Sequence, residues 1–373
     1  MPFRKEPPYT HGTVGRSAVV LVNLGTPDAP TRGAVRRYLK EFLSDPRVVE
    51  IPRAIWWCIL HLIILPFRSG KSAAKYATIW TSEGSPLKVH TQAQASLLRG
   101  ALGARGHDAL RVSMAMRYGS PSITEVLDKL AAEHVERIVI VPAYPQYSGT
   151  TTASISDAVF AHYQQVRNVP ELRMVKHYHD HDGYIDALAE NVQKHWEANG
   201  RGEKLLMSFH GVPKRTLLLG DPYHCECYKT ARLLAAKLRL NKDDYMVTFQ
   251  SRFGKAEWLQ PYTAPTVMAL AQGGVRRLDV ICPGFTSDCL ETLEEINMEV
   301  REDFLKAGGK EYHYIPCLNE EPAWIAGLAE IVEQHLIGWP TMMTAQQRDA
   351  EQAEADVGKA AALALGAANQ AVS

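Results

Sequence analysis

The 373-residue sequence has no excess of either charge, because its 41 Lys and Arg residues balance its 41 Asp and Glu residues. It therefore has neither a long-range field nor a basic arm to attract nucleic acid. Its six cysteines are scattered and do not make a disulfide framework, and residues 1–16 lack the apolar core of a signal peptide. These absences argue against a nucleic-acid partner and favour a reducing cytoplasm.

A long apolar run is also lacking. The densest one, AIWWCILHLIIL at 54–65, is flanked by Arg53 on one side and by Arg68 and Lys71 on the other. It is shorter than the roughly 20 residues that span a bilayer. Its length fits a buried core helix equally well, but the paired tryptophans and basic flanks favour a helix at a pocket mouth or a membrane surface.

The sequence does contain enough apolar residues, 46%, for a large core. At roughly 150 residues per domain, its length suggests two similar lobes. Runs rich in Val and Ile alternate with helical periodicity from 17 to 335, which predicts α/β lobes with doubly wound parallel sheets. The predicted strands include 18–22, 110–114, 137–142, 205–209, 245–249 and 277–282. No G-x-G-x-x-G or Walker loop follows a predicted strand, which disfavours a nucleotide-binding enzyme.

Three sequence blocks occur twice in the same order. They are LVNLGTP (21–27) with MSFHGVP (207–213), SMAMRYG (113–119) with TFQSRFG (248–254), and IVPAY (140–144) with ICPGF (281–285). Shared Gly and Pro turn chemistry can also produce short matches, but a duplication explains their order better. The blocks end predicted parallel strands, where ligands of such sheets bind, so both lobes should face one cleft.

The alignment gives the first lobe about 51 extra residues, and the apolar run lies among them. This favours a functional lip over a core helix. The predicted organisation is an N-terminal extension (1–16), a first α/β lobe (17–170) with the lip inserted near 51–70, a second α/β lobe (171–340), and an alanine-rich tail (341–373) that is disordered or a loose helix.

One imidazole stands out at the end of an apolar run. His210 lies in LLMSFHGVPKRTLLLGDPY at 205–223, where Gly211 and Pro213 shape a tight turn after it. A single histidine at a strand end is more often a structural hydrogen bonder than a catalyst. The turn that surrounds it favours a functional role here.

A second segment, FTSDCLETLEE at 285–295, is rich in acids. Asp288, Glu291, Glu295 and Glu299 are spaced three, four and four apart, so a helix would place them on one face. Asp288 and Glu291 also fit a helix N-cap with its reciprocal glutamate. Capping does not explain Glu295 or Glu299, which lie further into the helix.

Together these two segments closely resemble the signature of ferrochelatase, the enzyme that inserts ferrous iron into a porphyrin. The resemblance extends over 18–336 and implies two Rossmann-like chelatase lobes with a cleft between them. It implies that His210 and Glu291 form the catalytic and metal-handling pair, and that Asp288 and Glu295 continue the metal path outward. It also places Leu24, Arg117, Tyr118, Trp258 and Phe285 on the porphyrin pocket, with Arg68 and Ser85 near the propionates.

Metal insertion requires a held macrocycle, removal of two pyrrole protons, and passage of the metal from water. A neutral imidazole or carboxylate near the ring and oxygen ligands along the entry path suit these tasks. Either His210 or Glu291 fits the role of proton acceptor. A ladder of carboxylates leading inward to Glu291 fits the entry path.

The sequence departs from the resemblance at one position and lacks one optional feature of the family. Cys289 stands where many relatives have histidine, so it is either a soft ligand or a passive filler. The relatives with an iron-sulfur cluster carry four cysteines, usually three of them in a C-terminal extension, but this tail has none and Gly149 occupies another of the positions. We therefore expect no iron-sulfur cluster and no prosthetic group, with Fe²⁺ acting only as a substrate.

Two other groups of potential ligands fall outside these segments. The CEC sequence at 225–227, beside His224, lacks the second pair that a structural zinc site needs. His177, His179 and His181 alternate and would share a strand face. They fit an adventitious metal site, but a solvated strand end is the favoured interpretation.

The sequence thus predicts a lyase that inserts ferrous iron into protoporphyrin IX, with these two substrates as its partners. A related chelatase acting on coproporphyrin or inserting cobalt is one alternative, and a non-catalytic haem- or metal-binding protein is another. A carrier needs an axial ligand but no carboxylate ladder. The expected location is the cytoplasm, or the inner face of the membrane through peripheral contact of the lip.

Overall fold

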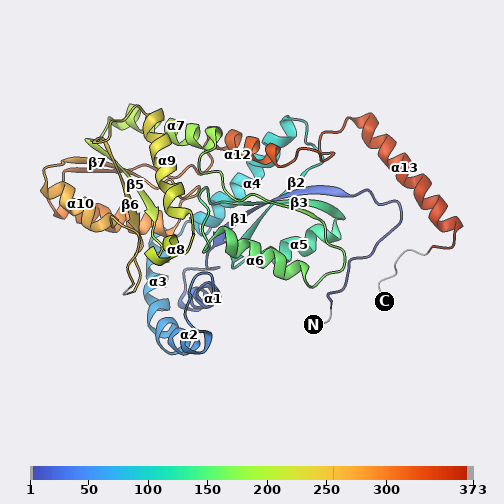
Figure 1. The fold of residues 1–373 in the computed structure, drawn as a ribbon, viewed down its shortest axis with the longest axis horizontal. Helices are drawn as coiled ribbons and strands as arrows, with labels where there is room; N and C mark the ends of the chain where they lie inside the picture. The colour runs from blue at the N-terminus through green and yellow to red at the C-terminus, as the bar shows by residue number, and fades with distance from the viewer. Residues whose placement is uncertain (1–2, 255, 368–373) are drawn as a thin grey trace.

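The computed structural model describes residues 3–254 and 256–367, which form two parallel sheets flanked by helices (Figure 1). The strand orders are β2-β1-β3-β4 and β6-β5-β7-β8. The first sheet contains β1 (Arg16–Gly25), β2 (Arg111–Tyr118), β3 (Val135–Pro142) and β4 (Glu171–Met174), and the second contains β5 (Lys204–His210), β6 (Tyr245–Gln250), β7 (Arg277–Ile281) and β8 (Glu311–Tyr314). The predicted pair of similar α/β lobes is confirmed.

The helices form a central layer, two outer layers and a projecting group. The central layer contains α4 (Pro86–Ala104), α7 (Asp182–Asn199), α9 (Tyr223–Lys237) and α12 (Pro322–Gln334), and the outer layers contain α5 (Ile123–Ala132), α6 (Thr152–Tyr163), α10 (Thr263–Gln272), the π-helix η2 (Glu291–Val300) and α11 (Arg301–Lys306). The projecting group contains α1 (Arg32–Leu43), α2 (Arg53–Ile59), the π-helical turn η1 (Leu60–Ile64) and α3 (Leu65–Ile79), while α8 (Lys214–Leu218) follows β5.

Strand β1 shows why the strands are apolar on both faces. Its side chains alternate, so Val19 and Leu21 enter the central core while Ala18, Val20 and Val22 enter the outer core beneath α5 and α6. Because helices cover both faces of the sheet, neither set of positions meets water. This double coverage produces the continuous apolar runs from which the strands were predicted.

One hydrophobic core joins the two lobes. It contains Leu21 of the first sheet, Met207 and Phe209 of the second, and the fully buried Trp324 of α12. The sheets therefore pack against a shared helical layer, which fixes the carboxyl ends of β1 and β5 relative to each other.

The internal repeat predicted from the sequence is visible in the fold. Both sheets have the same strand order, with β1 matching β5, β2 matching β6 and β3 matching β7. Equivalent turns follow β2 and β6, because Met116 N donates to Pro121 O at 2.7 Å and Phe249 N donates to Pro261 O at 2.8 Å. The common topology and matching local bonds support a duplication.

Two parts of the predicted organisation differ from the structure. Strand β4 pairs with β3, so the first sheet continues through Met174, and the boundary at 170 is wrong by one strand. A single helix, α13 (Ala345–Ala364), occupies most of the described tail and projects from the body (Figure 1). Disorder is therefore wrong for this part, although α13 buries no residue and fits the loose-helix alternative. Residues 368–373 of the tail lie outside the described residues.

Candidate active site

His210 lies at the carboxyl end of β5. Its Nδ1 is 2.7 Å from Gly211 O. Because a carbonyl can only accept, Nδ1 carries the proton, and Nε2 of the neutral ring is left with its lone pair. The ring faces Phe285, with 6.4 Å between the ring centroids. The backbone thus orients an imidazole that can accept a proton or bind a metal.

The turn after His210 requires glycine. A Cβ on Gly211 would lie 2.7 Å from Gln250 O and 3.1 Å from the Trp258 ring. Trp258 is also tied to this turn, because it forms a bridge with Pro213. The predicted pocket residue Trp258 therefore lies beside the histidine and helps to hold the turn in place.

The acidic segment forms a π-helix rather than the predicted α-helix. Glu291 is the first residue of η2, and residues four apart still lie near one another because each turn is only slightly wider. Glu291 O accepts a bond from Gln250 Nε2 at 2.8 Å, which attaches this end of η2 to the end of β6. The Glu291 side chain lines the cavity between the lobes.

Asp288 does not cap this helix, so that alternative is wrong. The helix begins after Leu290 without any side-chain cap. Asp288 Oδ1 accepts from Thr292 Oγ1 at 2.8 Å and from Tyr314 OH at 2.5 Å, and its Oδ2 accepts from Asn319 Nδ2 at 2.7 Å. Both oxygens are engaged inside the protein, which favours a structural role over metal contact.

The other acids divide into two sets. Glu295 accepts from Ser251 N at 2.7 Å and from Ser251 Oγ at 2.5 Å. Glu294 and Glu299 instead bind Lys75 of α3, with N to O distances of 2.9 and 2.8 Å. Among residues 3–254 and 256–367, Glu295 therefore has no Lys or Arg in its direct contacts, as expected for a carboxylate on a metal path.

Burial raises the pKa of Glu295, and the nearby charge of Glu291 raises it further, against the opposing effects of Ser251 and His210. The charges of His210 and Glu291 thus both act on the Glu295 carboxyl, so we treat these three residues as one electrostatic group. A raised pKa means that Glu295 must lose a proton, at a pH above the ordinary glutamate range, before it can bind a cation.

We expect Glu295→Gln to raise the apparent KM for ferrous iron more than the KM for porphyrin. The amide keeps the shape but removes the negative charge. In the unmodified protein, the KM for iron should fall as pH rises through the raised pKa of Glu295, and the variant should lack this dependence. Initial rates measured over a pH series check both statements. Equal changes in both KM values would indicate a structural role.

The cavity at Glu291 is built by both lobes. Its volume is about 30 Å³. Its walls include the end of β1, helices α1 and α3, the loop after β3 and the start of η2. The lining residues are Asn23, Leu24, Gly25, Thr26, Tyr38, Tyr76, Ser85, Leu87, Tyr144, Phe285, Cys289, Leu290 and Glu291. The predicted cleft at the carboxyl ends of the strands is thus confirmed, and Leu24, Ser85 and Phe285 lie on it.

Three tyrosines on this wall were missed in the sequence. Burial raises the pKa values of Tyr38, Tyr76 and Tyr144 well above the ordinary range, and the charge of Glu291 adds to each rise. Tyr144 OH is buried and makes no hydrogen bond within 3–254 or 256–367. The repeat contained the signal for Tyr144, because it matches Phe285 in the paired IVPAY and ICPGF blocks.

Cys289 shares the wall with Glu291. Burial raises the pKa of its thiol, and Glu291 adds to the rise. A protonated thiol is a poor metal ligand compared with a thiolate. The structure therefore favours the passive-filler interpretation of Cys289.

Arg117 and Tyr118 lie behind the cavity wall. Arg117 Nη2 donates to Asp45 Oδ2 at 2.6 Å, and Tyr118 OH donates to the same oxygen at 2.8 Å. Ser154 Oγ donates there as well, at 2.6 Å. This buried network supports the end of β2, so the structure does not bring either residue to the cavity as predicted.

Of the two residues predicted near the propionates, Ser85 lines the cavity and Arg68 does not. Arg68, on α3, places its guanidinium 4.5 Å from the centroid of the Phe253 ring, which belongs to the loop after β6. It therefore connects the first lobe to the second at the surface. Ser85 is buried and accepts from Thr26 Oγ1 at 2.8 Å. Only Arg68 is exposed enough to meet a charged substituent at the protein surface.

The lip helix has two faces. Trp56 and Leu60 are 5% and 1% exposed and belong to the core beneath α1 and α3. Trp57, Leu62 and Phe67 are 58%, 65% and 72% exposed. The segment is therefore both a core helix and a lip, because one face packs in the core and the other presents apolar side chains to solvent. Among the described residues, no helix is long and apolar enough to cross a membrane.

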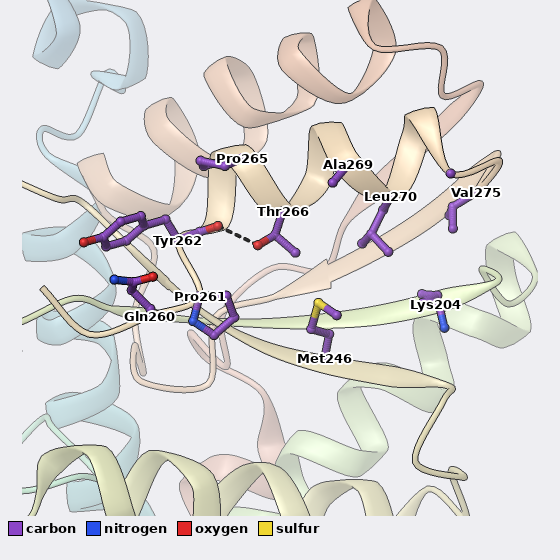
Figure 2. A pocket seen from close by; sticks show the side chains of 11 residues that line it. Lys204, Met246, Gln260, Pro261, Tyr262, Pro265, Thr266, Ala269, Leu270 and Val275 are labelled. Carbon is purple, nitrogen blue, oxygen red and sulfur yellow. Dashed lines mark hydrogen bonds between the residues drawn. The ribbon is translucent and has the colours of Figure 1, made fainter.

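A larger cavity, about 560 Å³, lies beside β6 and α10. Figure 2 shows Met246 and Pro261 on one side of it and Thr266 and Leu270 on the helix above. It contains none of the predicted site residues. The candidate active site is therefore placed at His210 and Glu291, on the basis of their chemistry and not of cavity volume.

The chain resembles known proteins over nearly its whole length. The family model described as Ferrochelatase matches residues 16–336. The ferrochelatase of Janthinobacterium sp. (strain Marseille) is 69% identical over 98% of this chain and 100% of its own length, and that of Herminiimonas arsenicoxydans is 68% identical over the same shares. The solved structure of CbiX, titled as the terminal enzyme for biosynthesis of siroheme in denitrifying bacteria, has a TM-score of 0.46 at 13% identity, covering 86% of this chain and 99% of that one. With the family model matching nearly the whole chain and relatives this similar, the chain belongs to the ferrochelatase family.

Proposed function

We propose that this enzyme inserts ferrous iron into protoporphyrin IX, releasing protohaem and two protons in the last step of haem biosynthesis. The observation that carries the proposal is the imidazole of His210, which donates from Nδ1 to Gly211 O at a strand end and lies close enough to Glu295 for its charge to act on that carboxyl. A carrier would need an axial ligand, but it would have no use for a line of carboxylates leading to it.

The roles divide according to chemistry. His210 Nε2 has the lone pair needed to accept a pyrrole proton, because Nδ1 donates to Gly211 O. Glu291 and Glu295 offer hard oxygen ligands suited to an incoming ferrous ion. Glu291 is also a carboxylate on the cavity wall, so it is the alternative proton acceptor. Leu24 and Phe285 supply apolar surface for the macrocycle.

Substrate entry requires the cleft to widen. The present volume of about 30 Å³ is far below the roughly 300–1,000 Å³ of pockets that enclose small molecules. Three contacts join α3 to the second lobe, namely Arg68 to Phe253, Lys75 to Glu294 and Lys75 to Glu299. We infer that these contacts separate when porphyrin enters, and that Arg68 then meets a propionate.

The exposed apolar face of the lip favours protoporphyrin over the more carboxylated coproporphyrin. Anaerobic incubation of the purified protein with ferrous iron and either porphyrin tests this directly, because metal insertion changes the porphyrin absorbance. We expect faster turnover of protoporphyrin. Preference for coproporphyrin, or for Co²⁺ over Fe²⁺, would support the corresponding alternative. Porphyrin binding without turnover would indicate a non-catalytic binding protein.

We also propose peripheral membrane contact through the exposed lip face, in a protein that resides in the cytoplasm. The exposed side chains Trp57, Leu62 and Phe67 lie near Arg53, Arg68 and Lys71, an arrangement typical of interfacial helices. The proposed reaction needs no resident cofactor and no iron-sulfur cluster.

We expect the triple variant Trp57→Ser, Leu62→Ser, Phe67→Ser to bind anionic vesicles more weakly while keeping its thermal stability. Each exposed apolar side chain contributes to burial in the interface. Vesicle sedimentation and thermal unfolding measure the two properties. As the matched control, Trp56→Ser should cost roughly 3–5 kcal/mol of folding stability, because Trp56 is core. Unchanged vesicle binding by the triple variant would contradict membrane contact.

A further inference from the structure

A second group of metal-ligating side chains lies outside the active site, where segment 175–181, which follows β4, meets α9. The group consists of His177, His179 and Glu226, and one ligand atom of each lies within 4.8 Å of the other two. His177 Nδ1 is 2.7 Å from Glu226 Oε1, and His179 Nδ1 is 3.4 Å from Glu226 Oε2. Two imidazoles and one carboxylate thus converge on one point.

The structure corrects the interpretation of these histidines as a solvated strand end. Strand β4 stops at Met174, before the histidines begin. The side chain of His179 is only 6% exposed. His181 turns away to accept from Gly183 N at 3.1 Å and caps α7. Two of the three alternating histidines therefore share a site and the third does not.

One atom of the group lacks a partner. His179 Nδ1 is buried and forms no hydrogen bond within the described part of the chain, because its approach to Glu226 Oε2 does not meet the geometry of one. Such a buried atom calls for an explanation, and a bound ion is one. The ligands of a tetrahedral zinc ion, at bonds near 2.0–2.1 Å, would be about 3.3 Å apart, and His179 Nδ1 lies 3.4 Å from Glu226 Oε2.

We propose that His177, His179 and Glu226 bind one divalent transition-metal ion, with zinc as the metal best suited to two imidazoles and a carboxylate. The side chain of His177 is 38% exposed, so an ion can enter from solvent and keep a water as its fourth ligand. Glu226 Oε2 also accepts from Tyr147 N at 2.7 Å. The ion would therefore hold segment 175–181, which connects the lobes, against α9 and the loop after β3.

The internal repeat provides a comparison within the same chain. His179 and Asn319 occupy equivalent places in the two lobes. The backbone oxygen of His179 accepts a hydrogen bond from Thr230 of α9 at 2.7 Å, and that of Asn319 accepts one from Gln94 of α4 at 2.8 Å. In the second lobe one imidazole, His90, meets one carboxylate, Glu320, at 2.8 Å. Asn319 stands where His179 stands in the first lobe. This pair supplies too few ligands for a comparable site.

Metal binding by the full chain tests the proposal, in a background carrying His210→Ala and Glu291→Ala to suppress binding at the active site. Equilibrium dialysis against Zn²⁺ is expected to leave one ion per chain, and Co²⁺ should give the visible absorption of a four- or five-coordinate ion. His179→Ala or Glu226→Gln should weaken binding by more than roughly 100-fold, beyond the loss caused by removing an outer partner of a ligand. His90→Ala is the matched control and should bind normally.

Thermal unfolding separates loss of a ligand from loss of the fold. Zn²⁺ should raise the melting temperature of the background protein and of His90→Ala, but not that of the ligand variants. The partly exposed His177 allows a milder variant, His177→Ala, which in the otherwise unmodified enzyme should insert iron at the normal rate without zinc. Absence of Zn²⁺ and Co²⁺ binding in the background protein, or full binding in all three ligand variants, overturns the proposal.

Discussion

Replacing His210 with alanine is expected to lower the rate of iron insertion by roughly 10²–10⁴-fold, the usual contribution of a positioned acid or base. Porphyrin affinity should change little, because His210 lies at a strand end while apolar groups such as Leu24 and Phe285 line the cavity. Glu291→Ala should have an effect of similar size, since it removes the carboxylate on the cavity wall. Insertion rates and porphyrin fluorescence quenching measure the two properties separately.

A conservative variant of Glu291 separates the loss of its charge from a loss of packing. Glu291→Gln keeps the volume of the side chain, so a loss of turnover with unchanged thermal unfolding assigns the effect to charge. Cys289→Ser is a matched control on the same wall, and as a neutral filler it should retain most activity. Near-normal turnover by Glu291→Ala would remove the proposed division of roles between His210 and Glu291.

The sequence predicted the strands well where both faces of a strand are covered. All six predicted strands are present, from β1 to β7 without β4. Strands β4 and β8 were missed because each has four residues, ELRM and EYHY, and lies at the edge of its sheet. Edge strands bury less surface and tolerate charge, so they lack the apolar run that marks a central strand.

The acidic helix shows a second limit of sequence reasoning. Spacing alone placed Asp288 in line with Glu291 and Glu295, but it could not show that Tyr314 and Asn319 occupy the oxygens of Asp288. These partners come from the segment that includes and follows β8 and are distant in sequence. Whether a carboxylate is free to bind a cation depends on such tertiary contacts, which periodicity does not contain.

The repeat, in contrast, predicted that equivalent strand ends of the two lobes face one cavity. It pairs Leu24 with His210 and Tyr144 with Phe285. In the structure Leu24, Tyr144 and Phe285 line one cavity, and the His210 ring faces Phe285. Equivalent strand ends of the two sheets meet at one cleft. Two residues that match in the repeat are therefore expected on opposite walls of that cleft.

Leu24→His is expected to convert the enzyme into a haem-retaining protein. Leu24 takes the place in the first lobe that His210 holds in the second, and its side chain lies on the cavity wall. A porphyrin between the lobes would then meet a potential metal ligand on one face and an apolar side chain on the other. A second imidazole would let the iron of the product take two axial ligands, which should slow its release.

The expected result is a first turnover at a nearly normal rate followed by slow steady-state turnover, because product release and not chemistry becomes limiting. The purified variant should also carry haem, visible as a Soret band. Leu24→Ile, which offers no ligand, is the matched control and should release product normally. Loss of the first turnover would place Leu24 in the chemical step instead, and normal steady-state turnover without bound haem would show that Leu24 does not face the metal. Either outcome would reject the prediction that an apolar wall opposite His210 is what allows the enzyme to release its product.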